Sequence, residues 1–191
     1  KLVNLLQQLK EQQKETLNRL HTAKDIYIKS THEAIIELLE EKIDQTSKRI
    51  EGMIKQKESL NIEYQNLQTI PAIGKETAVI LLRHLTDKNF ETANKFVAFA
   101  GLSPKIEQSG TSVNKKGRLS RYGHRQLKRA LFMPALVAYR MGAFPQLVRN
   151  LESAKKPKMI IIVALMRKLA KIAFYIHKTK KPFDKARHQT V

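Results

Sequence analysis

Apolar residues recur at spacings of three and four through residues 36–67 of this 191-residue chain. The positions hold Ile36, Leu39, Ile43, Thr46, Ile50, Met53, Lys57, Leu60, Tyr64 and Leu67. Such spacing draws one apolar stripe along a helix, and helices bury stripes of this kind against one another as coiled coils. The repeat therefore predicts a long helix that needs a partner helix.

A second, less regular series of the same spacing comes earlier in the chain, with Leu2, Leu6, Leu9, Gln13, Thr16 and Leu20. The intervening "TAKDIYIKSTHE" lacks Pro and Gly, so it continues the helix or bends at a cap on Asp25, Ser30 or Thr31. We expect a coiled coil over residues 1–66 that pairs two protomers in a homodimer. A coil that returns on itself, or an amphipathic hairpin packed on the following domain, is the alternative.

The positive charge lies in one part of the chain. Residues 1–69 hold 11 Lys and Arg against 11 Asp and Glu, so the whole net charge of +19 falls on residues 70–191. Residues 108–151 carry nine basic side chains and no acidic one. A field of this kind attracts polyanions, and nucleic acid is the expected partner, with an anionic membrane surface or non-specific adhesion as alternatives.

Composition limits the fold and its compartment. The chain has no Cys and no apolar run of about 18 residues, which excludes thiolate zinc sites and spanning helices. Its first residue is Lys and no signal-peptide pattern follows, so we interpret it as a piece of a longer protein. No strand-like alternation appears, and we predict an all-α fold. A compact helical domain would occupy residues 67–181, and residues 182–191 would be a disordered tail.

Two features of the carboxy-terminal half set the expected helices. Pro134 is expected to kink or break the helix that contains it. A helix over residues 158–178 should bury one side, formed by Ile161, Leu165, Leu169, Ile172 and Ile176.

The stretch "LQTIPAIGKETAVILLRHL" at 67–85 predicts two helices joined by a tight turn. Pro71 should end the first helix near Ile70, and Gly74 should supply a positive φ before the second helix. The pattern resembles a helix-hairpin-helix, whose backbone N–H groups hold a DNA phosphate, with Lys75 and Thr77 adding to the contact. A hairpin with only a structural role is the alternative, and Ala72 stands where the motif often has Gly.

Five short motifs then follow in order and carry a family resemblance. They are residues 70–74 (IPAIG), 98–104 (AFAGLSP), 108–110 (QSG), 120–123 (SRYG) and 127–131 (LKRAL). Together they resemble the carboxy-terminal transposase domain of the DEDD-type insertion-sequence transposases, relatives of the Piv DNA invertase. The resemblance covers about residues 66–140.

This resemblance implies a larger enzyme. Members of the family carry an amino-terminal RuvC-like domain with a metal-binding Asp/Glu cluster, for which Mg²⁺ is the expected ion, and recombine DNA under the guidance of a structured RNA. Nothing here matches the RuvC-like part, and Glu33, Glu37, Glu40 and Glu41 have the spacing of a solvated helix face. We therefore expect no metal or other cofactor in this chain, no cleavage of DNA by it alone, and a place in the bacterial cytoplasm with the nucleoid.

The resemblance also indicates the reacting group. The conserved serine of the family falls at Ser109, with Ser112 as the alternative, and a serine hydroxyl needs a base, a metal or a positive field to react. The DNA-binding residues expected around it are Lys115, Lys116, Arg118, Arg121, Arg125, Lys128 and Arg129, in addition to Gly74, Lys75 and Thr77. The competing hypothesis is a non-catalytic module that positions DNA and dimerises. His84, His124 and His177 receive no catalytic or metal-binding role, although His124 could contact phosphate.

Overall fold

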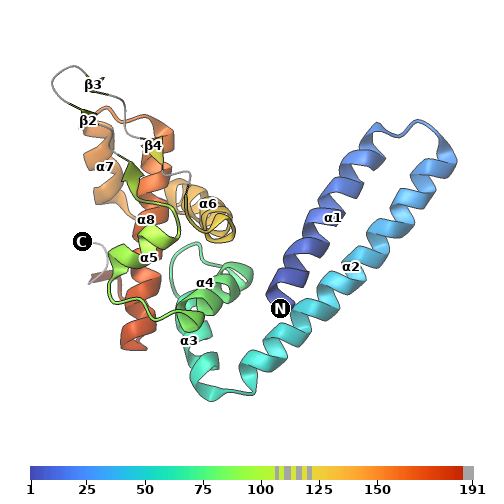
Figure 1. Cartoon of the computed structure of the whole chain (residues 1–191), viewed down its shortest axis with the longest axis horizontal. Helices are drawn as coiled ribbons and strands as arrows, with labels where there is room; N and C mark the ends of the chain where they lie inside the picture. Colours follow the sequence, from blue (N-terminus) through green and yellow to red (C-terminus); the bar gives the residue numbers. More distant parts are fainter. Residues whose placement is uncertain (106–107, 110–112, 115–117, 120–121, 187–191) are drawn as a thin grey trace. The chain divides into compact units, whose positions relative to one another are not determined.

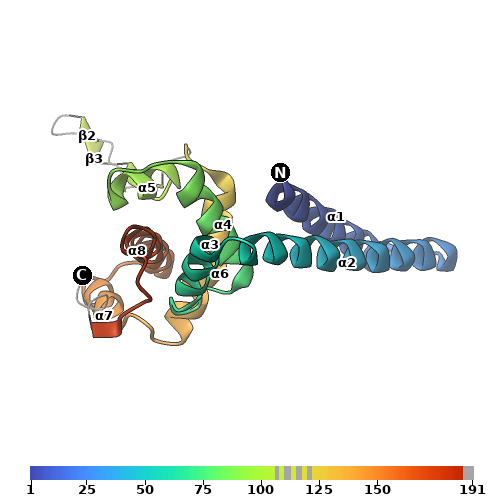
Figure 2. The ribbon, with the colours of Figure 1, turned by 90° about the horizontal axis from the view of Figure 1, so that it is seen from below.

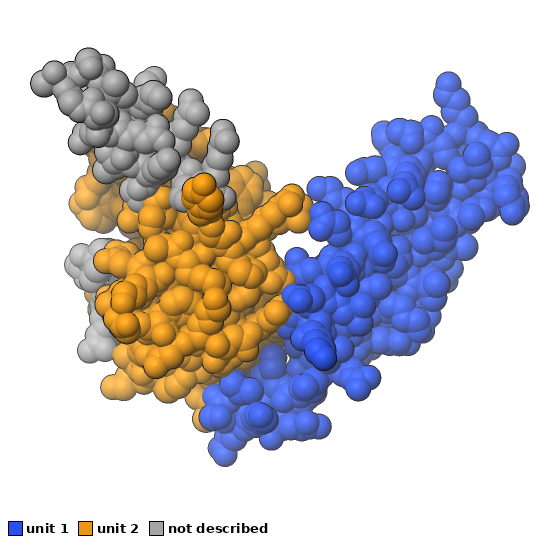
Figure 3. Space-filling model, viewed as in Figure 1, with its two compact units in different colours: residues 1–61 blue, residues 62–191 orange. Residues whose placement is uncertain are grey.

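A computed structural model of the chain describes residues 1–105, 108–109, 113–114, 118–119 and 122–186 (Figure 1). The prediction of an all-α fold is confirmed, since eight helices make up almost all of the regular structure in these residues. The other elements are four strands of two residues each, which the sequence did not predict. The chain divides into two compact units, residues 1–61 and 62–191 (Figure 3).

Unit 1 is a helical hairpin of α1 (Leu2–Thr22) and α2 (Ile26–Lys55), which pack against each other. The chain bends between them, because Asp25 Oδ1 accepts the backbone N–H groups of Tyr27 at 2.8 Å and Ile28 at 3.1 Å. Asp25 is thus the cap at the start of α2. Ser30 lies inside α2, where its hydroxyl donates to the Tyr27 carbonyl.

The inward faces of the hairpin follow the predicted series along α1 and along α2 as far as Ile50, and they depart from it at Met53. All six predicted positions of α1 are buried or half-buried, and Gln13 Nε2 donates to Glu40 Oε1 across the pair at 3.0 Å. On α2 the buried positions are Thr46, Ile50 and Ile54, whereas Met53 is 55% exposed. Steps of four residues suit a straight helix of 3.6 residues per turn, and the 3.5-residue repeat drifts away from it. Whether the hairpin also pairs two protomers stays a prediction.

Unit 2 is built around one apolar helix. Its elements after α3 (Glu58–Gln68) are α4 (Lys75–Asp87), α5 (Ala93–Phe99), α6 (Arg125–Arg140), α7 (Pro145–Ser153) and α8 (Lys158–Thr179). α8 packs against α4, α5, α6 and α7 (Figures 1 and 2). The five inward positions predicted for α8 are all buried, which confirms that prediction. The helix is apolar around more than half of its circumference because neighbours cover it on several sides.

Pro134 lies within α6 and does not end it. α6 ends at a Schellman turn, in which Gly142 has φ +62° and the Ala143 N–H donates to the Ala138 carbonyl. Pro145 then begins α7, where a missing N–H costs nothing.

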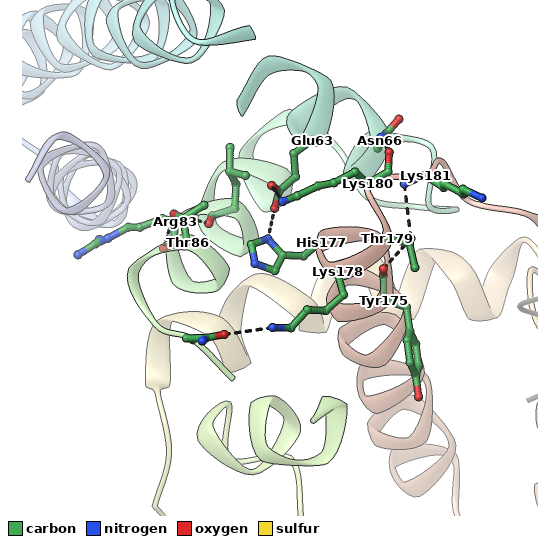
Figure 4. Close-up of polar contacts among 12 residues, drawn as sticks. Glu63, Asn66, Arg83, Thr86, Tyr175, His177, Lys178, Thr179, Lys180 and Lys181 are labelled. Atoms are coloured by element: carbon green, nitrogen blue, oxygen red, sulfur yellow. Dashed lines mark hydrogen bonds and ion pairs between the residues drawn. The ribbon is translucent and has the colours of Figure 1, made fainter. Parts of the chain in front are cut away.

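A buried carboxylate ties α3 to the end of α8 (Figure 4). Glu63 is 2% exposed, and its two oxygens pair with His177 Nδ1 and Lys180 Nζ. Burial raises the pKa of the Glu63 carboxyl, but the hydrogen bonds and charges of His177 and Lys180 outweigh burial and hold it below its usual value. Asn66 Nδ2 also donates to the Lys180 carbonyl at 2.8 Å.

The segment after α8 is bound to the residue that follows α3. Phe183 N donates to Thr69 Oγ1 at 2.7 Å, and Asp184 Oδ1 accepts the Ala186 N–H at 2.9 Å. Residues 182–186 of the predicted tail therefore have defined hydrogen bonds, and residues 187–191 lie outside the described residues.

Within the part of the chain that the structure describes, no single helix is long and apolar enough to cross a membrane. α6 and α7 reach that length and composition only as a pair, which is bent by 86°.

Candidate nucleic-acid interface

The segment between α5 and α6 forms an antiparallel arm that carries Ser109. β1 (Pro104–Lys105) pairs with β4 (Arg118–Leu119), and β2 (Gln108–Ser109) pairs with β3 (Val113–Asn114). In the second pair the Cα of Ser109 lies opposite that of Val113. The backbone of Ser109 is thus held in a short ladder.

The two ends of the arm meet at a crossing of two glycines. Gly101 has φ +71° and Gly123 has φ +120°, both in the region that favours glycine. A Cβ on Gly123 would lie 2.3 Å from Gly101 Cα, and one on Gly101 would lie 2.5 Å from the Tyr122 carbonyl oxygen. The His124 N–H donates to the Phe99 carbonyl at 2.8 Å beside the crossing. The backbone itself therefore fixes where the arm leaves unit 2 and where it returns.

α5 ends in a Schellman turn at Gly101. The Gly101 N–H donates to Ala98 O at 2.9 Å and the Leu102 N–H to Val97 O at 3.0 Å. Leu102 is fully buried, as the apolar residue after such a turn commonly is. The arm therefore begins directly from the core.

An aromatic cluster lies beneath the crossing. The rings of His84 and His124 are 4.1 Å apart, and the His124 ring is 5.4 Å from Phe99. His84 Nε2 lies 3.2 Å from Gln126 Oε1, which links α4 to the first turn of α6. Lys88 Nζ lies 4.4 Å from the centre of the Phe99 ring, a cation–π distance. The cluster joins α4, α5 and α6 under the arm.

Both histidines of the cluster are disposed to stay neutral. Burial lowers the pKa of His84 more than its bond to Gln126 raises it, and the charges of His124 and Arg83 lower it further. Burial also lowers the pKa of His124, with smaller effects from Arg83 and Lys88. Neutral rings can pack closely, whereas two imidazolium ions at this distance would repel each other. The two histidines therefore pack as uncharged rings beside the end of the arm.

Three of the predicted DNA-binding cations follow the arm on the first turns of α6. Arg125, Lys128 and Arg129 are spaced three and four apart, so they share one side of the helix. Arg125 and Arg129 are exposed, and Lys128 Nζ lies 3.0 Å from where a Cβ of Gly101 would stand. The first turn of a helix also offers backbone N–H groups that no carbonyl of the helix can accept. The base of the arm is thus a concentration of positive charge.

The turn between α3 and α4 differs from the prediction at its glycine. α3 ends at Gln68, and the positive φ of the turn falls on Ala72 at +68°, whereas Gly74 has φ −89°. The prediction of a positive φ at Gly74 was therefore wrong. Pro71 fixes its own φ, so the chain reverses at the next residue, and Gly74 is the extended N-cap of α4. Ala72 adopts this conformation at a cost of roughly 1 kcal/mol.

Gly74 and Lys75 lie at the surface, whereas Thr77 packs between α4 and α6. A Cβ on Gly74 would meet no atom within 4 Å, and Lys75 is exposed. Thr77 Oγ1 donates its single proton to the Ala130 carbonyl at 3.3 Å, which ties α4 to α6. Thr77 therefore contributes to packing in this conformation.

The remaining predicted residues lie in the arm. Ser109 and Arg118 belong to its strands, of which the structure describes the backbone. Ser112, Lys115, Lys116 and Arg121 lie outside the described residues. Among the described residues, no three His, Cys, Asp or Glu side chains are grouped as metal ligands.

Comparison with known proteins identifies the domain that carries the arm. A family model for the Transposase IS116/IS110/IS902 family matches residues 64–149, from α3 through the arm to α7. The chain carries a transposase-related domain of the IS110 family. The resemblance deduced from the five motifs over residues 66–140 is thereby confirmed.

Relatives extend the similarity beyond this IS110 domain. The pilin gene-inverting proteins of Moraxella lacunata and Moraxella bovis are each 36% identical over 195 residues, which cover 99% of the chain. An uncharacterized 43.6 kDa protein of insertion element IS110 from Streptomyces coelicolor is 41% identical over 80 residues, 41% of the chain and 19% of that protein. The chain spans about 60% of the length of the pilin gene-inverting proteins.

The sequence did not predict the crossing of Gly101 and Gly123 or the contact between the His84 and His124 rings. Gly101 and Gly123 flank the arm at its two ends, and this symmetry was the available signal. The contact between His84 and His124 had no such signal, because 40 residues separate two side chains that meet only when α4 packs on α6.

Proposed function

We propose that this chain is the DNA-binding and catalytic carboxy-terminal part of a transposase or site-specific recombinase, with Ser109 as the nucleophile. The observation that carries the proposal is the similarity along 99% of the chain to proteins named for inverting a gene. An arm fixed at its base by backbone contacts, with cations at its foot, supports it. The reaction acts on DNA in the bacterial cytoplasm.

The chemistry proposed for Ser109 is a transesterification. Its Oγ forms a bond to a DNA phosphorus while the bond from that phosphorus to one strand oxygen breaks, and the hydroxyl proton passes to a base. A hydroxyl of the recipient strand then displaces the serine and restores it. Arg118, Arg121 and Arg125 would hold phosphate oxygens and stabilise the charge of the transition state, a task that suits the planar guanidinium group.

A divalent metal, with Mg²⁺ expected, belongs to the proposal through the RuvC-like domain of the family. When bound, such a metal polarises the phosphate and activates the attacking or leaving oxygen. The described residues of this chain offer no set of ligands for it, so its place would be the RuvC-like domain. This chain contributes the serine, the cations and the position of the DNA.

The proposed partners are DNA, a guide RNA and a second copy of the chain. The net charge of +19 supports the two nucleic acids. Ile28, Ile35 and Leu38, which lie exposed on α2, support a homodimer through unit 1. Leu38→Lys should shift the mass measured by light scattering from dimer to monomer, and an unchanged dimer mass would count against this pairing.

The decisive experiment uses the full-length protein with its DNA and guide RNA. A denaturing gel would display a covalent protein–DNA adduct in the wild type, in Ser109→Ala and in Ser112→Ala. Loss of the adduct in Ser109→Ala alone supports the proposal, and loss in Ser112→Ala alone moves the nucleophile to that residue. An adduct that survives both changes shows that the domain only positions DNA, which is the competing function.

A second experiment tests this chain by itself. We expect it to bind duplex or structured nucleic acid with an affinity that falls steeply as salt rises, and to cleave nothing. Metal-dependent nicking by the purified chain would contradict the assignment of the metal to another domain.

A further inference from the structure

A groove follows the side of α8 opposite to the buried Glu63 network. Its cavity volume is about 660 Å³, and its α8 wall runs from Ala164 to Thr179. At a rise of about 1.5 Å per residue, this wall extends for roughly 22 Å, about four helical turns. Leu147 of α7 and Phe183 of the carboxy-terminal segment complete the walls. Figure 4 shows Tyr175 on the side of α8 away from His177.

The floor of the groove is apolar. Ile172 is 2% exposed and lies at the bottom, with Ala164 and Leu147 beside it. Phe183 is held in place by its N–H bond to Thr69 and by the edge-on packing of its ring against Phe144 at 6.5 Å. The wall that Phe183 provides is therefore a fixed part of unit 2.

The lining carries an excess of positive charge. Arg167, Lys168, Lys171 and Lys181 line the groove together with one carboxylate, Asp184. Among the described residues, Lys168 has neither a hydrogen-bond nor an ion-pair partner, although it is only 8% exposed. Burial, and then the charge of Lys171, lower the pKa of Lys168. Most of the Lys168 side chain is buried, but its ammonium is not among the enclosed polar atoms that lack a hydrogen bond, so an anion in the groove could reach it and offset the charges of Lys168 and Lys171.

We propose that this groove binds a helical segment of a partner protein whose apolar stripe is flanked by carboxylates. A groove of four turns along a helix matches the stripe of an amphipathic helix, which buries its apolar side chains in such grooves. The cations that line the groove would pair with the flanking Asp or Glu side chains. This surface lies mostly beyond residue 149, so it is separate from the matched transposase domain and from the arm.

Shape and chemistry favour a protein segment over a nucleic-acid strand. Sites for single strands combine a cationic track with a series of aromatic faces on which successive bases stack. Here the groove is aliphatic at Ile172 and Leu147. Of its two aromatic rings, Phe183 packs on Phe144 and Tyr175 packs on Phe174, so they do not form a series of open faces.

The test is fluorescence anisotropy on the whole chain with three labelled probes. The first is a peptide of about four helical turns with a Leu stripe flanked by Glu, and the second has the same composition in scrambled order. The third is a single-stranded DNA oligonucleotide. Because the net charge of the chain is +19, the scrambled peptide measures attraction that does not depend on the groove. We expect the striped peptide to bind at least about tenfold more tightly than the scrambled one.

Variants locate the binding. Lys171→Glu and Lys168→Met should each weaken the striped peptide by about tenfold, whereas Lys156→Glu, which changes an exposed lysine outside the groove, should change it less than about twofold. A thermal melt of each variant establishes that it is folded. Equal binding of the two peptides, or equal losses in all three variants, would overturn the proposal. DNA that binds more tightly than the striped peptide and weakens with Lys171→Glu would assign the groove to nucleic acid.

Discussion

The two units of the chain bury their side chains to very different extents. The twelve largest fully buried side chains among the described residues all belong to unit 2. Among the described residues each unit leaves eight large apolar side chains exposed, but unit 1 is the shorter of the two, residues 1–61 against 62–191. Those of unit 1 are Leu5, Leu17, Ile26, Tyr27, Ile28, Ile35, Leu38 and Met53. The positive charge divides in the same way, since residues 1–69 are neutral. Unit 2 therefore holds the fully buried core and the positive charge, whereas unit 1 exposes large apolar side chains more densely along its length.

The comparison predicts that backbone strain at the arm is the most damaging change. Gly123→Ala should destabilise unit 2 by about 3 kcal/mol or more, because the new Cβ would both clash with Gly101 and occupy a positive φ. Urea unfolding followed by circular dichroism measures this loss. The midpoint for unit 1 should not move.

Three other substitutions separate the effect of the clash from the effect of the positive φ. Gly142→Ala has a positive φ but no clash and should cost about 1 kcal/mol, and Gly74→Ala has neither and should cost less. Ala72→Gly should stabilise by up to about 1 kcal/mol, because it relieves a positive φ. If Gly123→Ala proved no worse than Gly142→Ala, the glycine crossing would not be a fixed contact.

The next effect concerns the buried carboxylate that closes unit 2. Glu63→Gln should lower the free energy of unfolding by about 2 kcal/mol, because it removes the negative charge that His177 and Lys180 share. Glu58→Gln, on the exposed first turn of the same helix, is the matched control and should stay within about 0.5 kcal/mol. Equal effects of the two changes would mean that the ion pairs contribute nothing.

A smaller effect is expected on DNA affinity, and it distinguishes the cations of unit 2 from those of unit 1. Arg125→Ala with Arg129→Ala should weaken duplex binding about tenfold and reduce the salt slope by about one per lost phosphate contact. Lys24→Ala with Lys29→Ala removes two exposed charges from unit 1 and should leave the slope unchanged. Equal losses in both pairs would show that DNA binding follows net charge alone, and would break the comparison.

The smallest effect is a dependence of stability on pH. The pKa values of His84 and His124 are lowered, so the unfolded chain binds more protons than the folded chain as pH falls below about 6.5. The stability that comes with the two neutral histidines is therefore present above that pH and is lost below it. The Glu63 pKa is lowered from 4.5, so a second loss follows in more acidic solution.

Thermal melts at about pH 7.5 and pH 5.5 measure the first of these losses. His84→Gln should reduce the difference in Tm between the two conditions, since it removes a group that titrates in this window. His21→Gln, at an exposed position of α1, should leave the difference as in the wild type. A difference that is the same in all three proteins would show that the histidine pair does not set it.

The helices were predictable where one local pattern decided them. The apolar side of α8 and the inward positions of α1 follow from spacing alone, and the stop at Gly101 follows from one residue type. The turn at Pro71 was predicted, but its positive φ was assigned to Gly74 because glycine is the usual residue there. Proline instead forced the reversal onto its neighbour Ala72.

The parts that escaped prediction depend on contacts between distant segments. Glu63 and His177 are 114 residues apart, and neither has a neighbour in sequence that marks it as buried. Lys168 reads as one more surface cation, yet the packing of α7 and the carboxy-terminal segment encloses it. The QSG motif gave the position of Ser109 along the chain. The pairing of Ser109 with Val113 was not predicted, because it depends on how the segment between Gly101 and Gly123 folds back on itself.

The crossing of Gly101 and Gly123 fixes both ends of the arm independently of its length. Because the chain closes on itself through backbone atoms at Gly101 and Gly123, this closure depends on the two glycines and not on the side chains of the arm. Closing a longer segment costs little more, since the entropy of closure rises only slowly with length. The segment between the two glycines can therefore change in length while the helices that carry it stay in place.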